Sequence, residues 1–195
     1  MSGVRFLLPK TNEVVFPGPW ETVDDPINVP NVESQDPPMG SLLTNPALTP
    51  QTTLQWDVRH PVASLGVERF NEAATSPPMA RLELESPQLP WKVEVFPRTP
   101  NIHVTVHDVL ATIHKTLRGQ ITRGEWERFN DTRKHSVLVA RGQRVQDYEF
   151  GRMLDEFYIH PRRIDSLGEC TRFGGLVPAP YRGSNSFDLE FVRRG

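Results

Sequence analysis

The feature that most constrains the fold is a helix signal near the middle of the chain, over residues 104–117. Its apolar side chains recur every three or four positions and so share one face of a helix: Val106, Val109, Leu110, Ile113 and Leu117. Thr105 precedes this stripe and Asp108 stands three positions later, which is the spacing of a capping box, and Gly119 supplies a stop signal. The pattern predicts an amphipathic helix that follows a short extended stretch and buries one face in a core.

Three stretches alternate apolar and polar residues in the way that strands do. Residues 54–58 are typical of a short strand with one buried face, and residues 187–192 of a closing strand. Residues 80–96 hold two alternating runs around a turn-rich connector, which predicts an antiparallel pair. The side chains expected to point inward are Leu82, Leu84, Trp91, Val93 and Val95, with Glu83, Glu85, Lys92 and Glu94 on the outer face.

Further helices are predicted after the first one. Thr122 and Glu125 have the spacing of a second capping box, residues 132–140 favour a helix over a strand, and residues 148–157 repeat apolar side chains at helical intervals. Together with the strands, these elements predict the α+β class. We expect a small antiparallel sheet packed against two to four helices, with a long proline-rich N-terminal arm.

The distribution of proline divides the chain in two. Nineteen of the 195 residues are proline, and they recur so often in residues 1–45 that no long helix can form there, because proline fixes φ and lacks an amide donor. We therefore predict an extended arm over 1–45 and a single α+β domain over 46–195. The arm also carries Val15, Phe16 and Trp20, so two alternatives stay open: it packs on its own domain, or it reaches a partner.

Composition indicates the compartment. Cys170 is the only cysteine, so no intrachain disulfide can form and a reducing compartment fits best. The formal net charge is -2, which does not suggest a dedicated nucleic-acid or membrane protein. No apolar stretch approaches the length of a membrane span or of a secretory signal. We expect a cytoplasmic or nuclear protein that is not secreted and has no membrane partner.

Two groups of polar residues are the candidate ligand-binding site. His103, His107 and Asp108 surround the start of the predicted helix, and Arg162, Arg163 and Asp165 stand together further along the chain. Histidines beside a carboxylate can bind a metal or act as a base, and two guanidinium groups can hold an anion. The alternative is structural: Asp108 stabilises the helix start, and Asp165 pairs with an arginine. The spacing matches no metal motif, so no metal, cofactor or catalytic residue is predicted.

A basic stretch and a pair of glycines are further candidates for a binding function. Residues 118–144 hold seven basic and three acidic side chains, the best case for nucleic-acid contact, yet solvated helix faces are the usual meaning of such charge. Nucleic acid is therefore not the expected partner. Gly174 and Gly175 either let a ligand approach the backbone or form a tight turn into the last strand. For Cys170 we expect a buried, inert thiol.

Six short motifs occur in an order and spacing that resemble a known family. They are LQWD at 54–57, ATSPP at 74–78, PWKVEV at 90–95, VTVHDVL at 104–110, RIDSL at 163–167 and FGGL at 173–176. The chain resembles, over about residues 45–192, a domain family of unknown function from mushroom-forming fungi. The resemblance implies an intracellular fungal domain and supplies no catalytic residues.

The sequence predicts an ordered core but no group of polar residues that gather at one site as catalytic residues do. This favours a non-enzymatic protein-interaction or scaffolding module, with a protein partner or self-association. The proline-rich arm would be a docking element or an intramolecular clasp. One alternative is an enzyme or small-ligand-binding protein with a site between residues 103–108 and 162–165. A second is nucleic-acid binding through the basic face of residues 118–144.

Overall fold

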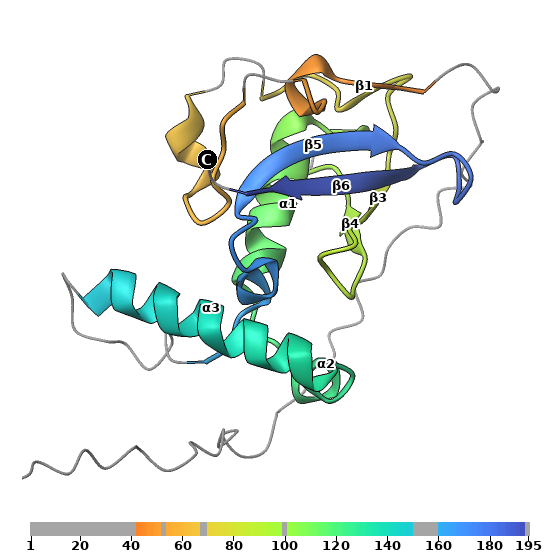
Figure 1. Ribbon diagram of the computed structural model, residues 1–195. Coiled ribbons are helices and arrows are strands. Elements are labelled where there is room, and N and C mark those ends of the chain that lie inside the picture. The colour runs from red at the N-terminus through yellow and green to blue at the C-terminus, as the bar shows by residue number, and fades with distance from the viewer. Residues whose placement is uncertain (1–41, 52–53, 67–69, 99–100, 150–159, 194–195) are drawn as a thin grey trace, which may run out of the picture. The chain divides into compact units, whose positions relative to one another are not determined.

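The computed structural model describes residues 42–51, 54–66, 70–98, 101–149 and 160–193 (Figure 1). All of them belong to one compact unit, Gln35–Gly195. Most of the predicted arm and most of the helix predicted over 148–157 lie outside the described residues.

A four-stranded sheet forms the centre of this unit. Its strands are β3 (Leu82–Glu85), β4 (Val93–Val95), β5 (Arg172–Pro178) and β6 (Ser186–Val192), in the order β4-β3-β6-β5. β3 pairs antiparallel with β4, as predicted from the alternation over 80–96. β6 pairs antiparallel with β5 and parallel with β3. The sheet is therefore mixed: the predicted antiparallel pairing is present in β3–β4 and β5–β6, and the central β3–β6 pair is parallel.

The strands alternate as the sequence predicted. Leu82, Leu84, Val93 and Val95 are buried on one face, while Trp91 lies half-buried in the turn before β4. The other face carries charges that pair across strands: Arg81 contacts Glu94 at 2.6 Å, and Lys92 contacts Glu85 at 2.7 Å. Among the described elements no helix covers that charged face (Figure 1).

The helix α1 (Val106–Arg118) covers the apolar face of the sheet (Figure 1). The predicted capping box is present: the Asp108 amide donates to Thr105 Oγ1 at 3.2 Å, and the Thr105 amide donates to Asp108 Oδ2 at 3.0 Å. The five predicted stripe residues are all fully buried. Burying side chains of this size contributes about 1.5–3 kcal/mol each, so α1 and the sheet form the main core. This confirms the α+β class.

Two further helices follow: α2 (Arg123–Glu127) and α3 (Asp131–Glu149). α2 begins with the predicted capping box of Thr122 and Glu125. α3 includes the helix predicted over 132–140 and extends it. Only Val137 of the described part of α3 is fully buried, in a small cluster with Ile121 and Phe129. Apolar burial therefore contributes little to the position of α3.

Two predictions for the strands need correction. Residues 54–58 make only a single bridge, between Asp57 and Arg172, although Trp56 and Val58 are buried as expected. Gly174 and Gly175 lie inside β5, where the ladder has a bulge, and not in a turn before the last strand. Gly175 has φ +120°, and the chain at Thr49 and Pro50 lies directly against it.

A short pair of strands, β1 (Leu43–Thr44) and β2 (Thr75–Ser76), lies beside the main sheet. The 3-10 turn η1 (Pro46–Leu48) follows β1, capped by the Asn45 side chain, and places Leu48 fully in the core. Leu43 and Thr44 thus pair within the folded unit. Cys170 is half-buried and packs at the edge of the core.

Candidate functional site

The first predicted group lies at the start of α1. Asp108 is buried and serves the helix start, because its Oδ2 accepts the Thr105 amide at 3.0 Å and the Thr105 hydroxyl at 2.7 Å. His107 is half-buried, and its ring meets the Phe70 ring edge-on with centroids 5.6 Å apart. His103 is half-buried in the loop before the helix. Asp108 therefore makes the contacts expected of a residue that stabilises the helix start.

The second predicted group lies in the 3-10 turn η4 (Arg163–Leu167). Asp165 is buried and accepts the Arg162 amide at 2.7 Å and the Arg144 Nε at 2.7 Å. Arg163 donates to Glu125 Oε1 at 2.7 Å, and its guanidinium lies 5.0 Å from the centre of the Trp91 ring. Each member of this group therefore contacts another part of the chain.

The structure does not bring the two groups together. The Arg163 amide donates to the carbonyl of Gly119, the residue that ends α1, at 2.9 Å. Asp108 lies in the first turn of the same helix. A helix of this length spans about 20 Å, at about 1.5 Å per residue. One small ligand cannot contact both groups, so the two groups do not form one ligand-binding site.

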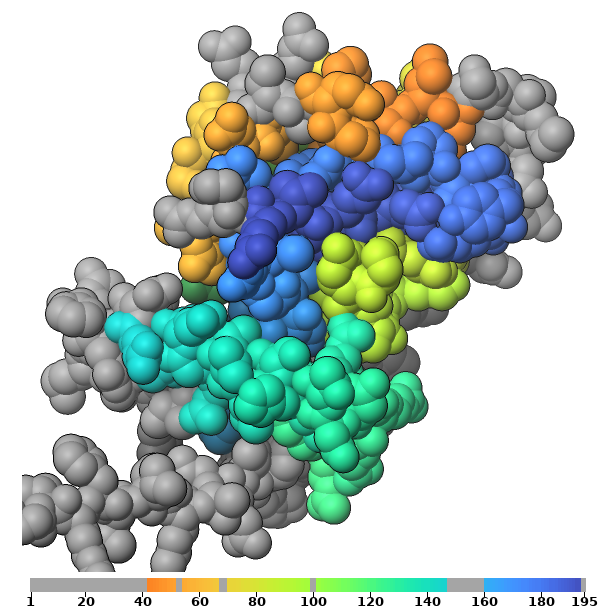
Figure 2. Space-filling view, in the orientation of Figure 1, coloured from red at the N-terminus to blue at the C-terminus, as the bar shows by residue number. Residues whose placement is uncertain are grey.

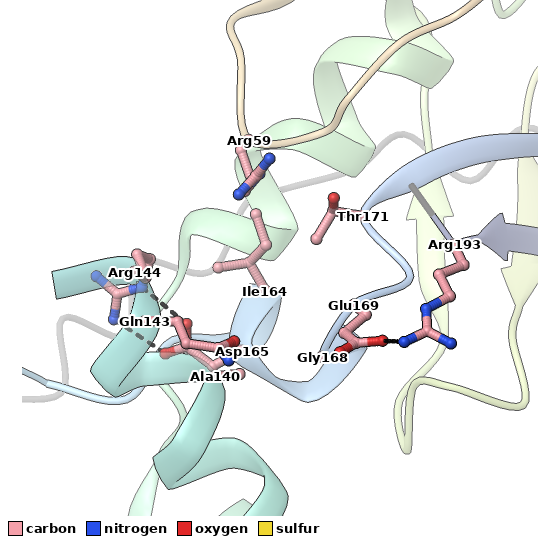
Figure 3. Close-up of a pocket in the computed structure, with 10 residues that line it drawn as sticks. All are labelled: Arg59, Ala140, Gln143, Arg144, Ile164, Asp165, Gly168, Glu169, Thr171 and Arg193. Atoms are coloured by element: carbon pink, nitrogen blue, oxygen red, sulfur yellow. Dashed lines mark hydrogen bonds and ion pairs between the residues drawn. The ribbon is translucent and has the colours of Figure 1, made fainter. Parts of the chain in front are cut away.

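An open cavity of about 440 Å³ adjoins the second group (Figure 3). α3 contributes Gln143 and Arg144, η4 contributes Ile164 and Asp165, and Arg59 comes from the loop before η2 (Val62–Leu65). The cavity is also lined by Glu169 and Thr171, which precede β5, and by Arg193, which follows β6. Figure 3 shows Ile164 in the middle of this set, with the charged side chains around it.

Three arginines reach the cavity, and each pairs with a carboxylate. The inner pair, Arg144 and Asp165, is bidentate, with Nε–Oδ1 at 2.7 Å and Nη2–Oδ2 at 2.9 Å. Its side chains are only 13% and 2% exposed. Arg59 holds Asp57 at 2.6 Å. The outer pair, Arg193 and Glu169, is 74% and 61% exposed.

Arg59 also sets the charge of its partner carboxyl. Burial of Asp57 would raise its pKa, but the side-chain and backbone hydrogen bonds from Arg59 oppose this effect, with smaller contributions from the charges of Arg59 and His60. The pKa of Asp57 is therefore held below its usual value of 3.8. The carboxylate stays ionised at neutral pH, and the pair adds no net charge to the wall of the cavity.

Most members of the predicted basic face also make contacts within the chain. Arg123 pairs with Glu127 at 2.9 Å, Arg144 with Asp165, and Arg133 donates to the carbonyl of Gln88. The Arg133 guanidinium lies 5.2 Å from the centre of the Phe129 ring, and burial lowers its pKa. Arg133 and Arg144 are therefore turned toward the protein, whereas Arg123 and its partner Glu127 lie exposed on the surface.

Sequence reasoning identified Asp165 but missed the other charged residues of the cavity. Arg59, Arg144, Glu169 and Arg193 come from four separate segments, and no local spacing connects them. The Asp57–Arg172 bridge, the β5–β6 pairing and the Arg144–Asp165 ion pair bring these segments together, so only the tertiary fold reveals the site. Within the described ranges, no three His, Cys, Asp or Glu side chains gather as metal ligands would. No helix in the described part of the chain is long and apolar enough to cross a bilayer.

His114 makes the stability of the fold depend on pH. Its Nε2 lies 3.3 Å from Arg118 Nη1, and its ring centroid lies 6.3 Å from that of Trp56. Burial, and then the charge of Arg118, lower the pKa of His114 below the usual 6.5. As pH falls below 6.5, the unfolded chain therefore takes up a proton before the folded one, and stability present at pH 7 is lost.

We expect the melting temperature to fall between pH 7 and pH 5, and to fall less in His114→Gln. Thermal unfolding followed by circular dichroism at both values measures this difference. Equal falls in the two proteins would contradict the role of His114.

Comparison with known proteins identifies one relationship. The model of a family described as "Family of unknown function (DUF6699)" matches residues 54–186. No curated protein and no solved structure gives a significant match.

Proposed function

The chain belongs to the DUF6699 family, which has no assigned function, and we propose from its own surface that it is a non-enzymatic protein-interaction module. α3 is its contact element, and a second copy of the chain is the partner to be tested first. The proposal includes a fungal origin and a cytoplasmic or nuclear location. The motif resemblance supports the first, and the lone cysteine supports the second.

The observation that carries the proposal is the distribution of charge around α3. Between residues 132 and 146 every Arg and Lys side chain is partly buried, and none of the exposed residues is Asp, Glu, Lys or Arg. An ordinary surface helix turns its charged residues to the solvent. One exposed stripe consists of His135, Leu138, Val139, Gly142 and Gln146, which we call the outer face of α3. Figure 2 shows α3 lying open on the surface.

The outer face has properties that suit contact with a second protein. Leu138 is 36% exposed and Val139 is 48% exposed. Charged residues are depleted in the centres of protein interfaces. Because the face holds no Asp, Glu, Lys or Arg, two copies can meet there without repulsion between such charges. Gly142, which has no side chain to hold a partner away, lies in the same stripe.

Sedimentation velocity of the full chain over a wide concentration range tests the proposal. We expect a concentration-dependent dimer in the wild type, and its loss in Val139→Lys, because a lysine in each copy would place like charges in the contact. Lys134→Gln is the matched control, since it removes a charge from a partly buried position on the same helix. A wild type that stays monomeric, or a dimer that Val139→Lys leaves intact, would overturn the proposed contact.

The proline-rich arm is the second element of the proposed module. It carries apolar residues, among them Phe16 and Trp20, that a purely solvated linker would not need. A deletion should stop at residue 41, because Leu43 and Thr44 pair with β2. If the arm docks on a partner or clasps its own domain, deletion of residues 1–41 changes self-association or the melting temperature. If neither changes, the arm has no part in the function.

A further inference from the structure

We propose that residues 36–41, the last part of the proline-rich arm, form a strap that covers an exposed apolar rim of their own domain. The rim consists of Leu43, Pro77, Pro78 and Ile102. Met39 lies against Ile102 in this contact. The strap gives the arm of the proposed module a docking site, and it would exist whether or not α3 contacts a second copy.

The rim is unusually apolar for an exposed surface. Three large apolar side chains in the described ranges are more than half exposed, and two of them belong to the rim: Leu43 at 60% and Ile102 at 84%. Pro77 and Pro78 are exposed as well, and none of the four side chains carries a polar group. Apolar side chains that gather on the surface of a folded domain mark a contact site.

Three neighbouring segments bring the rim together. β1 pairs antiparallel with β2, so that Leu43 lies opposite Ser76. On the other side of β2, the Ala74 amide donates to the Val104 carbonyl at 2.9 Å, and this segment is also antiparallel to β2. Leu43 and Ile102 therefore lie at the same end of the three segments. Their backbones are about 10 Å apart, because neighbouring strands are about 4.8 Å apart.

The arm joins the domain at this same end. The antiparallel pairing directs the chain that precedes Leu43 past Ser76 and toward Pro77. Met39 is four residues before Leu43, and an extended chain advances about 3.3–3.6 Å per residue. Four residues thus cover about 14 Å, which exceeds the separation of β1 from Ile102. Met39 can reach the rim without strain.

The sequence of the strap suits an irregular apolar surface. The Met39 side chain is unbranched and flexible, so it fills gaps between other side chains. Pro37 and Pro38 lack the amide donor that burial would leave without a partner. Gly40 separates these residues from β1 and lets the chain turn toward the rim.

Charge complementarity sets the direction of the strap. Arg98 is exposed, and its carbonyl accepts the amide of Asn101, the neighbour of Ile102, at 2.8 Å. In the described part of the chain no carboxylate pairs with Arg98. Asp36 carries the only charge of the strap and stands three residues before Met39. With Met39 on Ile102, Asp36 is within reach of Arg98.

The covalent connection favours this segment over a separate partner. A short tether holds its segment at an effective concentration on the order of 1 mM. A contact with a dissociation constant of about 0.1 mM would then be closed about 90% of the time. A second copy or another protein at micromolar concentration could not displace the strap with an equally weak contact.

A double-mutant cycle in the full chain tests the strap. Met39→Ser and Ile102→Ser each remove one side of the contact. We expect each to lower the folding equilibrium constant about fivefold in urea unfolding, as the loss of about half the burial of such a side chain does. The double variant should lose little more than either single variant, because the contact is already broken. Ile102 is so exposed that its replacement should leave the fold intact.

Two controls show whether the effect belongs to the rim. Tyr181 is 73% exposed in the turn between β5 and β6, so the effects of Tyr181→Ser and Met39→Ser should add. In amide NMR spectra, Met39→Ser should shift the signals of Arg98 and Ile102. Val32→Ser, in the arm before the strap, should leave these signals unchanged.

Strict additivity of Met39→Ser and Ile102→Ser would overturn the strap, and so would unchanged amide signals of Arg98 and Ile102 in Met39→Ser. A coupling that strengthens with protein concentration would assign the rim to the segment of a second copy and overturn the intramolecular contact. The cycle repeated in Val139→Lys separates the two proposals, because the strap should persist there whatever that change does to self-association.

Discussion

Replacement of Asp165 by alanine is expected to lower the free energy of unfolding by about 3–5 kcal/mol, because it leaves a buried guanidinium without its partner. The Asp165 side chain is 2% exposed and accepts both Nε and Nη2 of Arg144. It also accepts the amide of Arg162 at 2.7 Å. Since a domain is stable by only about 5–15 kcal/mol, this change is large. Urea denaturation followed by circular dichroism measures it.

The buried pair can be separated from general damage to the fold by a double-mutant cycle. Arg144→Met removes the cation and leaves the aspartate buried, so it should also destabilise. The double variant should lose less than the sum of the two single changes, because neither charge is then left unmatched. Glu169→Gln, in the exposed pair nearby, should change stability by at most about 1 kcal/mol. A loss below about 1 kcal/mol in Asp165→Ala would contradict the structural role of the pair.

Replacement of Gly175 by alanine is the second change with a large expected effect. A Cβ at this position would lie 2.5 Å from the Pro50 nitrogen and 2.7 Å from the Thr49 carbonyl carbon, both backbone atoms. The φ of +120° is also one that alanine rarely adopts. Steric overlap and backbone strain each cost about 1–3 kcal/mol, so we expect a loss of about 2–6 kcal/mol in denaturant unfolding.

Gly142→Ala is the matched control for Gly175→Ala, and it should change the free energy of unfolding in the opposite direction. Gly142 lies inside α3, where an added methyl group would meet no atom within 4 Å and the φ is not unusual. Alanine is favoured over glycine in a helix by about 1 kcal/mol, so this change should stabilise the monomer. If both variants were destabilised alike, the close approach of residues 49–50 to β5 would not be the cause.

The sequence predicted those parts of the fold that local chemistry determines. The two capping boxes, the buried stripe of α1 and the alternation of β3, β4 and β6 are each visible within a few residues. The mixed sheet was not predicted, because β3 and β6 are paired by the tertiary fold and no local signal records a parallel partner. The glycine pair of β5 was misinterpreted because Pro50, which explains Gly175, is far away in the sequence.

The same distinction applies to the candidate site. Asp165 and Asp108 were identified, and the structure places both as capping carboxylates. The cavity itself joins α3, η4, the loop at Arg59 and the ends of β5 and β6. The spacing of residues along the chain does not show that these segments lie together. Sequence patterns therefore identified individual carboxylates but not the constellation around them.

The parallel pairing of β3 with β6 has a consequence for the folding rate. Residues 83–85 pair with residues 186–188, so the central contact of the sheet closes a loop of about a hundred residues, and contacts of this kind slow folding. The β3–β4 hairpin and α1 can form from nearby residues, but β3 keeps an unpaired edge until β6 arrives. During synthesis that edge is exposed until residue 192 has left the ribosome. It is the place where chaperones would be expected to bind the nascent chain and where incomplete chains would aggregate.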